Sequence, residues 1–209
     1  MKISFSKGKN WKNELIQAYT FRFTETPDFT QLEDCITTAV NPDHWEGFDN
    51  ISLLSKERYG LGVTAKLRCS FEGVGCPEII LVEELEQCED GAVRYGHCFE
   101  TVLWKNGINE WRHYRENDGC CHWNLRLGMT FPVTEGDIHE LTVQVLDKQL
   151  HITLDERKTV LRTEDLPTQF HVGVTACEGI ARLYDFEIIP YREEVPKLRD
   201  FVPSRLRIR

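Results

Sequence analysis

No run of apolar residues in this sequence is long enough to cross a membrane, because a membrane-spanning helix needs roughly 18 or more of them in succession. The N-terminal segment MKISFSKGKNWKNELIQ also lacks the apolar stretch of a secretion signal. We therefore expect a cytoplasmic protein that has no membrane partner.

The sequence motifs of the common catalytic and cofactor-binding loops are absent as well. There is no Gly-x-Ser-x-Gly and no Walker-type phosphate loop, and Tyr59-Gly60-Leu61-Gly62 lacks the third glycine and the following helix of a dinucleotide site. The eight cysteines include no Cys-x-x-Cys pair, which favours reduced thiols over disulfides. Cys120-Cys121-His122 lacks the usual spacing of a zinc site, so we expect no cofactor and no metal.

Positive charge is also scarce, because the 209 residues carry a formal net charge of −9. A general nucleic-acid binder needs a basic surface, so we expect no nucleic-acid partner. Basic residues gather only in the last segment, where Lys197 to Arg209 holds five of them against the single acid Asp200. We divide the chain into an N-terminal extension (1–17), one domain (18–191) and a basic C-terminal tail (192–209).

What the sequence does contain is a series of short segments in which apolar and polar residues alternate. In the segment 63–71, Val63, Ala65, Leu67, Cys69 and Phe71 all fall on one side of an extended chain. About a dozen such segments follow one another with turn residues between them, and a helical period is almost absent. This pattern predicts an all-β fold of two packed antiparallel sheets.

The segment from His97 to Leu127 predicts three adjacent strands joined by two tight turns. Asn106-Gly107 and Asp118-Gly119 are both typical of the two-residue type I′ hairpin turn. If these dipeptides form the turns, the first hairpin pairs Glu100 with His113, and the second pairs His113 with Asn124.

Alternation along these strands then sorts the side chains into two faces. The predicted core face holds Phe99, Leu103, Ile108, Tyr114, Trp123, Leu125 and Leu127, together with Thr101, Glu110 and Arg112. The predicted outer face holds Glu100, Trp104, Asn109, Trp111, His113, Arg115, His122, Asn124 and Arg126.

The outer face combines flat indole rings with fixed hydrogen-bonding groups, which is the chemistry that binds a sugar. Aromatic rings pack against the CH groups of a sugar, and the surrounding polar side chains bond its hydroxyls. The alternative is structural: Trp104 and Trp111 would then lie under a loop, and Glu100 and Arg126 would form a surface ion pair.

The last third of the chain resembles the closing strands of the concanavalin A-like lectin and glucanase superfamily. The resemblance rests on the segments HELTVQV (139–145), LHITLD (150–155), FHVGV (170–174) and YDFEI (184–188). It implies a jelly-roll sandwich of two curved antiparallel sheets, in which ligands lie across the concave sheet. The three strands of 97–127 are our candidates for that sheet.

The glucanase branch of this superfamily places its catalytic acids in a Glu-x-Asp-x-Glu or Glu-x-Asp-x-x-Glu strand. The only Glu-x-Asp here is Glu116-Asn117-Asp118, which falls in a predicted turn and has no third carboxylate after it. Glycoside hydrolysis needs two carboxylates that flank the bond. We therefore transfer no catalytic residue from the family.

Three functional hypotheses remain open. The first is a carbohydrate-binding protein that holds an oligosaccharide or other small sugar on Trp104, Asn109, Trp111, His122, Asn124 and Arg126, with Glu100 and His113. The second is an intracellular glycoside hydrolase or lyase that uses Glu100 and His113 as acid and base, with Arg126 steadying charge and Glu83 or Glu84 as a further carboxylate. The third is a non-catalytic interaction domain or homo-oligomer whose aromatic face is an interface.

Overall fold

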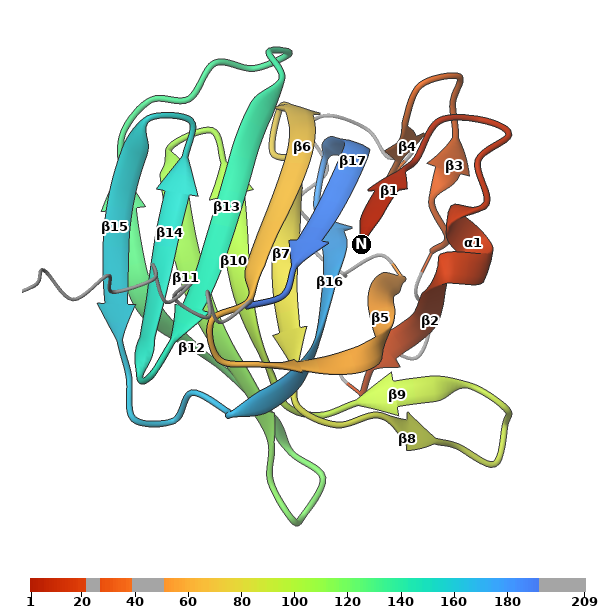
Figure 1. Ribbon diagram of the computed structural model, residues 1–209, viewed down its shortest axis with the longest axis vertical. Helices are drawn as coiled ribbons and strands as arrows, with labels where there is room; N and C mark the ends of the chain where they lie inside the picture. Colours follow the sequence, from red (N-terminus) through yellow and green to blue (C-terminus); the bar gives the residue numbers. More distant parts are fainter. Residues whose placement is uncertain (22–26, 39–50, 192–209) are drawn as a thin grey trace, which may run out of the picture.

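The computed structural model describes residues 1–21, 27–38 and 51–191. These residues form two packed β-sheets, shown as layers in Figure 1, and one short helix, α1 (Trp11–Glu14). The predicted all-β, two-sheet sandwich is therefore confirmed. Within the described ranges no helix is long and apolar enough to span a membrane. The predicted basic tail (192–209) lies outside the described residues.

The two sheets are called sheet A and sheet B. Sheet A runs β15 (Arg157–Arg162), β14 (Gln149–Leu154), β13 (His139–Leu146), β6 (Thr64–Glu72), β17 (Ile180–Ile189), β4 (Ile36–Thr37) and β3 (Thr30–Gln31), with β1 (Lys2–Ser4) paired to β17. Sheet B runs β12 (Cys121–Thr130), β11 (Gly107–Arg115), β10 (Cys98–Trp104), β7 (Cys76–Val82), β16 (Gln169–Cys177), β5 (Ser52–Gly60), β2 (Leu15–Thr20), β9 (Val93–Tyr95) and β8 (Glu86–Gln87).

The main core lies between the sheets and follows the alternation of the strands. Phe71 and Phe186 from sheet A and Phe99 and Phe170 from sheet B are all fully buried in one cluster. Because successive side chains of a strand point to opposite faces, the residues between them on sheet B point away from sheet A. We call that second surface the outer face of sheet B.

Residues 1–17 are part of the sandwich rather than an extension of it. Lys2 pairs with Glu187 in the β1–β17 ladder, and Trp11 is buried in the main core. Leu15 opens β2, which pairs with β5 in sheet B. The range predicted as an extension therefore contributes strands to both sheets and a side chain to the main core.

The β10–β11 hairpin keeps the predicted faces, although its register differs from the prediction. Lys105 and Asn106 form the turn, and Trp104 pairs with Gly107. Neither turn residue has a positive φ, whereas Gly107 does, at 129°. The pairing is shifted by two residues, so Glu100 lies opposite Trp111 instead of His113. A shift of two leaves every side chain on its predicted face.

The β11–β12 hairpin is shifted by one residue, and this reverses the predicted face of several side chains. The backbone N–H of Glu116 bonds the Cys120 carbonyl, and Gly119 has a φ of 88°. The turn is thus a three-residue loop with a left-handed glycine rather than a two-residue type I′ turn. His113 pairs with Trp123, and a register shift opposite Glu110 and Trp111 leaves Arg126 without a ladder position.

The predicted register is therefore wrong for Cys121 to Leu125, whereas Leu127 packs against the main core as predicted. Trp123 lies on the outer face of sheet B, and Leu125 is 51% exposed instead of buried in the core. His122 and Asn124 lie on the opposite face of this strand.

Candidate functional site

A cavity of about 410 Å³ opens on the outer face of sheet B, and we call it the tryptophan–glutamate cleft. Strands β7, β10, β11, β12 and β16 and the β16–β17 turn supply its walls. The lining residues are Cys76, Glu78, Glu100, Val102, Trp104, Asn109, Trp111, Trp123, Cys177 and Glu178.

Three tryptophans from three neighbouring strands line the cleft. Trp104 ends β10, Trp111 lies in the middle of β11, and Trp123 lies near the start of β12. Each ring is half-buried, so it keeps an accessible surface. The indole nitrogen of Trp104 is buried and has no hydrogen-bond partner among the described residues. The cleft thus offers flat apolar surfaces and an indole N–H donor.

Three glutamates contribute the acidic part of the cleft. Glu78 and Glu100 are almost fully buried, with exposures of 1% and 2%, and Glu100 accepts a hydrogen bond from the Cys98 thiol at 3.3 Å. Because Val102 pairs with Glu78, Glu100 lies diagonally across the β7–β10 ladder from Glu78. The Cα atoms of diagonal neighbours of this kind are about 7–8 Å apart. Glu178 is half-buried in the β16–β17 turn, where its φ is 56°.

Sequence reasoning missed Glu78, Glu178 and Trp123. Glu78 is the third residue of β7, which is otherwise apolar, and an acid in such a strand was the available signal. Nothing in the sequence of one strand says which strand lies beside it, so the approach of Glu78 to Glu100 needed the fold. Trp123 was missed because of the one-residue error in register.

His113 occupies a different place from the one predicted for a catalytic base. Its ring is fully buried and stacks on Trp123, with ring centroids 4.4 Å apart. It is absent from the described residues that line the cleft, and its ladder partners are Cys98 in β10 and Trp123 in β12. His113 therefore packs against Trp123, which lines the cleft.

The other three predicted ligand residues lie away from the cleft. His122 stacks on Tyr114 at 5.1 Å, and Asn124 is exposed. Arg126 bonds Asp165 at 2.9 Å in the connection between β15 and β16. Of the eight predicted residues, the structure brings Glu100, Trp104, Asn109 and Trp111 together.

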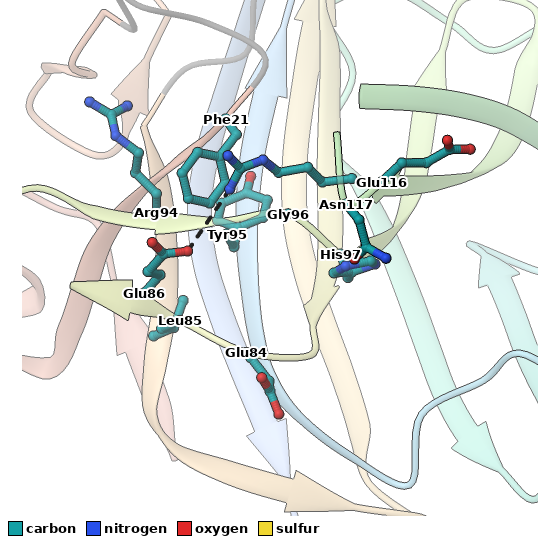
Figure 2. Close-up of a pocket in the computed structure, with 11 residues that line it drawn as sticks. Phe21, Glu84, Leu85, Glu86, Arg94, Tyr95, Gly96, His97, Glu116 and Asn117 are labelled. Carbon is teal, nitrogen blue, oxygen red and sulfur yellow. Dashed lines mark ion pairs between the residues drawn. The ribbon is translucent and has the colours of Figure 1, made fainter. Parts of the chain in front are cut away.

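A second cavity, of about 480 Å³, lies further along β10 and β11, between the β8–β9 hairpin and the β11–β12 turn (Figure 2). Arg115 lies over the Phe21 ring at 3.9 Å and reaches Glu86 at 4.0 Å. Arg94 bonds Asp90 at 2.8 Å. The contact of Arg115 with Glu86 ties the β8–β9 hairpin to β11, and both ion pairs give arginines of the second cavity acidic partners.

The suggested extra carboxylates, Glu83 and Glu84, do not reach the tryptophan–glutamate cleft. Glu83 pairs with Arg112, and Glu84 lines the second cavity. Within the described residues no group of three or more His, Cys, Asp or Glu side chains could hold a metal ion. The eight cysteines are thiols outside any disulfide. Cys76 and Cys177 lie directly opposite each other in the β7–β16 ladder, at the rim of the cleft.

Comparison with known proteins finds likeness only at the level of the fold. No family model and no curated protein matches the sequence. Solved structures do match. The carbohydrate-binding module CBM66 from Bacillus subtilis has a TM-score of 0.56 at 10% identity, over 77% of this chain and 89% of the module.

Two further solved structures have the same architecture. A glycoside hydrolase family 16 endo-glucanase from Bacteroides ovatus has a TM-score of 0.57 at 9% identity, over 90% of this chain and 99% of the enzyme. The exoplasmic/lumenal domain of VIP36, bound to Ca²⁺ and Man3GlcNAc, has a TM-score of 0.54 at 10% identity, over 79% of this chain and 82% of that domain. The predicted jelly-roll sandwich is confirmed, and at these identities the likeness concerns the fold alone.

Proposed function

We propose that this chain, a concanavalin A-like jelly roll in its fold, binds a saccharide in the tryptophan–glutamate cleft. The observation that carries the proposal is the meeting of three half-buried tryptophans and three glutamates in one cavity on the outer face of sheet B.

The chemistry of the cleft suits a sugar better than a purely apolar ligand. Indole rings offer broad, rigid surfaces for the CH faces of a pyranose ring. Carboxylates accept hydrogen bonds from hydroxyl groups, and the Asn109 amide can both donate and accept. The volume of about 410 Å³ falls in the range of small-ligand sites, which is about 300–1,000 Å³. These features support binding of a short saccharide.

The solved structures of similar fold add support of a general kind. They include a carbohydrate-binding module, and a domain bound to Man3GlcNAc. Because identity is near 10%, we carry over no residue and no ligand from them. The proposal rests on the side chains of this chain.

Titration with a panel of oligosaccharides tests the proposal, with tryptophan fluorescence and calorimetry as readouts. A sugar that binds the wild type should lose at least about tenfold in affinity with Trp111→Ala, because stacking on the ring and burial of its surface are both lost. His122→Ala is the matched control, since His122 belongs to the same hairpin but lies away from the cleft. Failure of the whole panel to bind, or equal losses in both variants, would contradict the proposal.

A second candidate function, glycoside hydrolysis, is favoured by the position of Glu78 beside Glu100. The carboxyl groups are about 5–5.5 Å apart in retaining enzymes and about 6.5–9.5 Å apart in inverting ones. Diagonal neighbours on adjacent strands have Cα atoms about 7–8 Å apart, so the side chains of Glu78 and Glu100 are near enough to act as a pair. His113 is not among the described residues that line the cleft, whereas Glu78 and Glu100 both are. Glu78 and Glu100 are the pair that we propose in its place.

Isosteric variants separate catalysis from binding. Glu78→Gln and Glu100→Gln should each abolish hydrolysis of a bound oligosaccharide, while calorimetry still detects its binding. Glu84→Gln, in the second cavity, is the matched control and should keep full activity. Hydrolysis that persists in both cleft variants would rule out this mechanism.

A further inference from the structure

We propose that the saccharide held in the tryptophan–glutamate cleft carries an apolar substituent of several carbons, an alkyl or acyl group, which lies on Leu125 beside the cleft. The inference rests on the proposed function and adds the chemical class of the ligand. It is drawn from the geometry of β12, the edge strand of sheet B that borders the cleft.

Leu125 is exposed next to the cleft. Among the exposed large apolar side chains of the described residues, it is the one that belongs to a strand of sheet B, and it is 51% exposed. It lies opposite Trp111 in the β11–β12 ladder, and opposite residues of neighbouring strands share a face. Because Trp111 lines the cleft, Leu125 lies on the outer face of sheet B directly beside it.

A β-bulge turns Leu125 toward this face. Strict alternation would place Leu125 and Leu127 on the same face, but Arg126 between them has no ladder position. Leu127 therefore packs against the main core, whereas Leu125 faces outward. Arg126 holds the bulge in place, because it pairs with Asp165 at 2.9 Å and donates to Thr163 at 3.1 Å. Bulges commonly re-aim a side chain next to a functional site.

Gly128 leaves the space next to Leu125 open. It pairs with Asn109, which lines the cleft. A Cβ added at Gly128 would lie 3.6 Å from Asn109 Oδ1 and 3.8 Å from Leu125 Cδ2, which is ordinary contact. Its φ is not positive, so the backbone does not require a glycine there. The missing side chain leaves a surface bordered by Leu125, Trp111 and Asn109, which we call the leucine shelf.

The leucine shelf suits an apolar part of the ligand. Leu125 offers no hydrogen bond, so a sugar hydroxyl placed on it would lose its water without a replacement. An alkyl or acyl group placed there would remove apolar surface of both partners from water. Because the shelf continues from the cleft, a substituent can reach it while the sugar ring stays on the tryptophans.

The experiment compares methyl and hexyl β-glycosides of glucose, galactose and mannose, with tryptophan fluorescence and calorimetry as readouts. The hexyl glycoside of a sugar that binds should bind at least about tenfold more tightly than the methyl glycoside, because its extra methylene groups are partly removed from water. Its binding should also show the more negative heat-capacity change. The compound 1-hexanol tests the chain without a sugar and should bind more weakly than the hexyl glycoside.

Variants of Leu125 assign the preference to the leucine shelf. Leu125→Ser should bring the hexyl glycoside to within about threefold of the methyl glycoside and leave the affinity for the methyl glycoside unchanged. Leu125→Met keeps an apolar side chain and should keep the preference. Val160→Ser, which changes an exposed apolar residue of β15 in sheet A, is the matched control and should leave both affinities unchanged.

Each result has a distinct meaning. Hexyl glycosides that bind no more tightly than methyl glycosides, or that fail where a sugar of the wider panel binds, would overturn the inference and leave saccharide binding intact. Equal losses for both glycosides in Leu125→Ser would assign Leu125 to the sugar ring and overturn it too.

Two further controls separate other occupants of the leucine shelf. Binding of 1-hexanol as tight as that of the hexyl glycoside would overturn the link to a sugar. A dimer of the free protein that Leu125→Ser abolishes in analytical ultracentrifugation would assign the shelf to a second copy, which also overturns the inference. If no glycoside and no member of the oligosaccharide panel binds, the proposed function fails as well.

Discussion

At the scale of single residues, Glu110 shows how burial changes the chemistry of a carboxyl group. Its side chain is fully buried between the sheets, and Thr101 donates a hydrogen bond to it at 2.5 Å. Burial raises the pKa of Glu110 to about 8, although the bond from Thr101 opposes the rise. Below that pH the folded protein therefore carries this group in its protonated, neutral form.

This raised pKa makes stability depend on pH. The folded state holds the Glu110 proton up to about pH 8, whereas the unfolded chain releases it near the ordinary value of 4.5. Stability is therefore fully present below about pH 4.5 and is lost as the pH rises through about 8. The loss should amount to roughly 2–4 kcal/mol in the free energy of unfolding.

Glu110→Gln removes this titration, and urea unfolding from pH 5 to pH 9 tests the prediction. The variant should become more stable relative to the wild type as the pH rises. Glu116→Gln, which changes an exposed acid, should follow the wild-type profile. Parallel curves for the wild type and Glu110→Gln would show that Glu110 does not titrate in this range.

At the scale of elements, the two hairpins of 98–130 decide which side chains reach the cleft. Gly107 has a φ of 129°, and a Cβ added there would lie 1.9 Å from the Met129 carbonyl oxygen. The close passage of β12 therefore requires a glycine at this position. Gly91, in the β8–β9 turn, has a φ of 83° but nothing within 4 Å of an added Cβ.

Alanine substitution at these two glycines separates crowding from backbone strain. Gly91→Ala should lower the free energy of unfolding by about 1 kcal/mol, from strain alone. Gly107→Ala should lower it by more than about 2 kcal/mol, since β12 must also move. Circular dichroism during thermal unfolding measures both losses. Equal losses would mean that the hairpin absorbs the added methyl group without cost.

The same hairpins show how far the sequence leads and where it stops. Alternation of apolar and polar residues predicted the sandwich and placed Glu100, Trp104 and Trp111 on one face. That placement is correct because a two-residue shift of the β10–β11 register leaves each side chain on the same face. It failed for His122 and Asn124, because a glycine after a polar residue suits a two-residue turn and a three-residue loop alike. The two-residue turn and the three-residue loop place β12 in registers that differ by one residue. Only the packing of the strands selects between these two registers.

At the scale of the whole molecule, the outer face of sheet B is divided into an open part and a covered part. Ala18, Leu54 and Ile80 belong to a second, smaller core on this face, against which Leu85 and Val93 pack beside the β8–β9 hairpin. Tyr95 bonds Ser52 at 2.6 Å and anchors the hairpin to β5. The tryptophan–glutamate cleft lies in the open part, at one end of the outer face of sheet B.

This division predicts a limit on the length of the saccharide. A cavity of about 410 Å³ has room for only a few sugar units, so affinity should rise with length and then stop rising at about three units. Calorimetry with a series from monosaccharide to hexasaccharide measures this limit. A steady gain up to the hexasaccharide would mean that the ligand extends across the hairpin.

The facing pair Cys76 and Cys177 at the rim of the cleft should be able to form a disulfide when the protein is oxidised. Directly opposed residues of an antiparallel ladder have Cα atoms about 4.5–5.5 Å apart, a distance that a disulfide spans. Glutathione disulfide would oxidise the pair, releasing two glutathione thiols as one sulfur–sulfur bond forms. Mass spectrometry should then detect the loss of two hydrogens in the wild type and not in Cys177→Ser. An oxidant would thereby add a covalent link across the β7–β16 ladder at the mouth of the cleft, and a reductant would remove it.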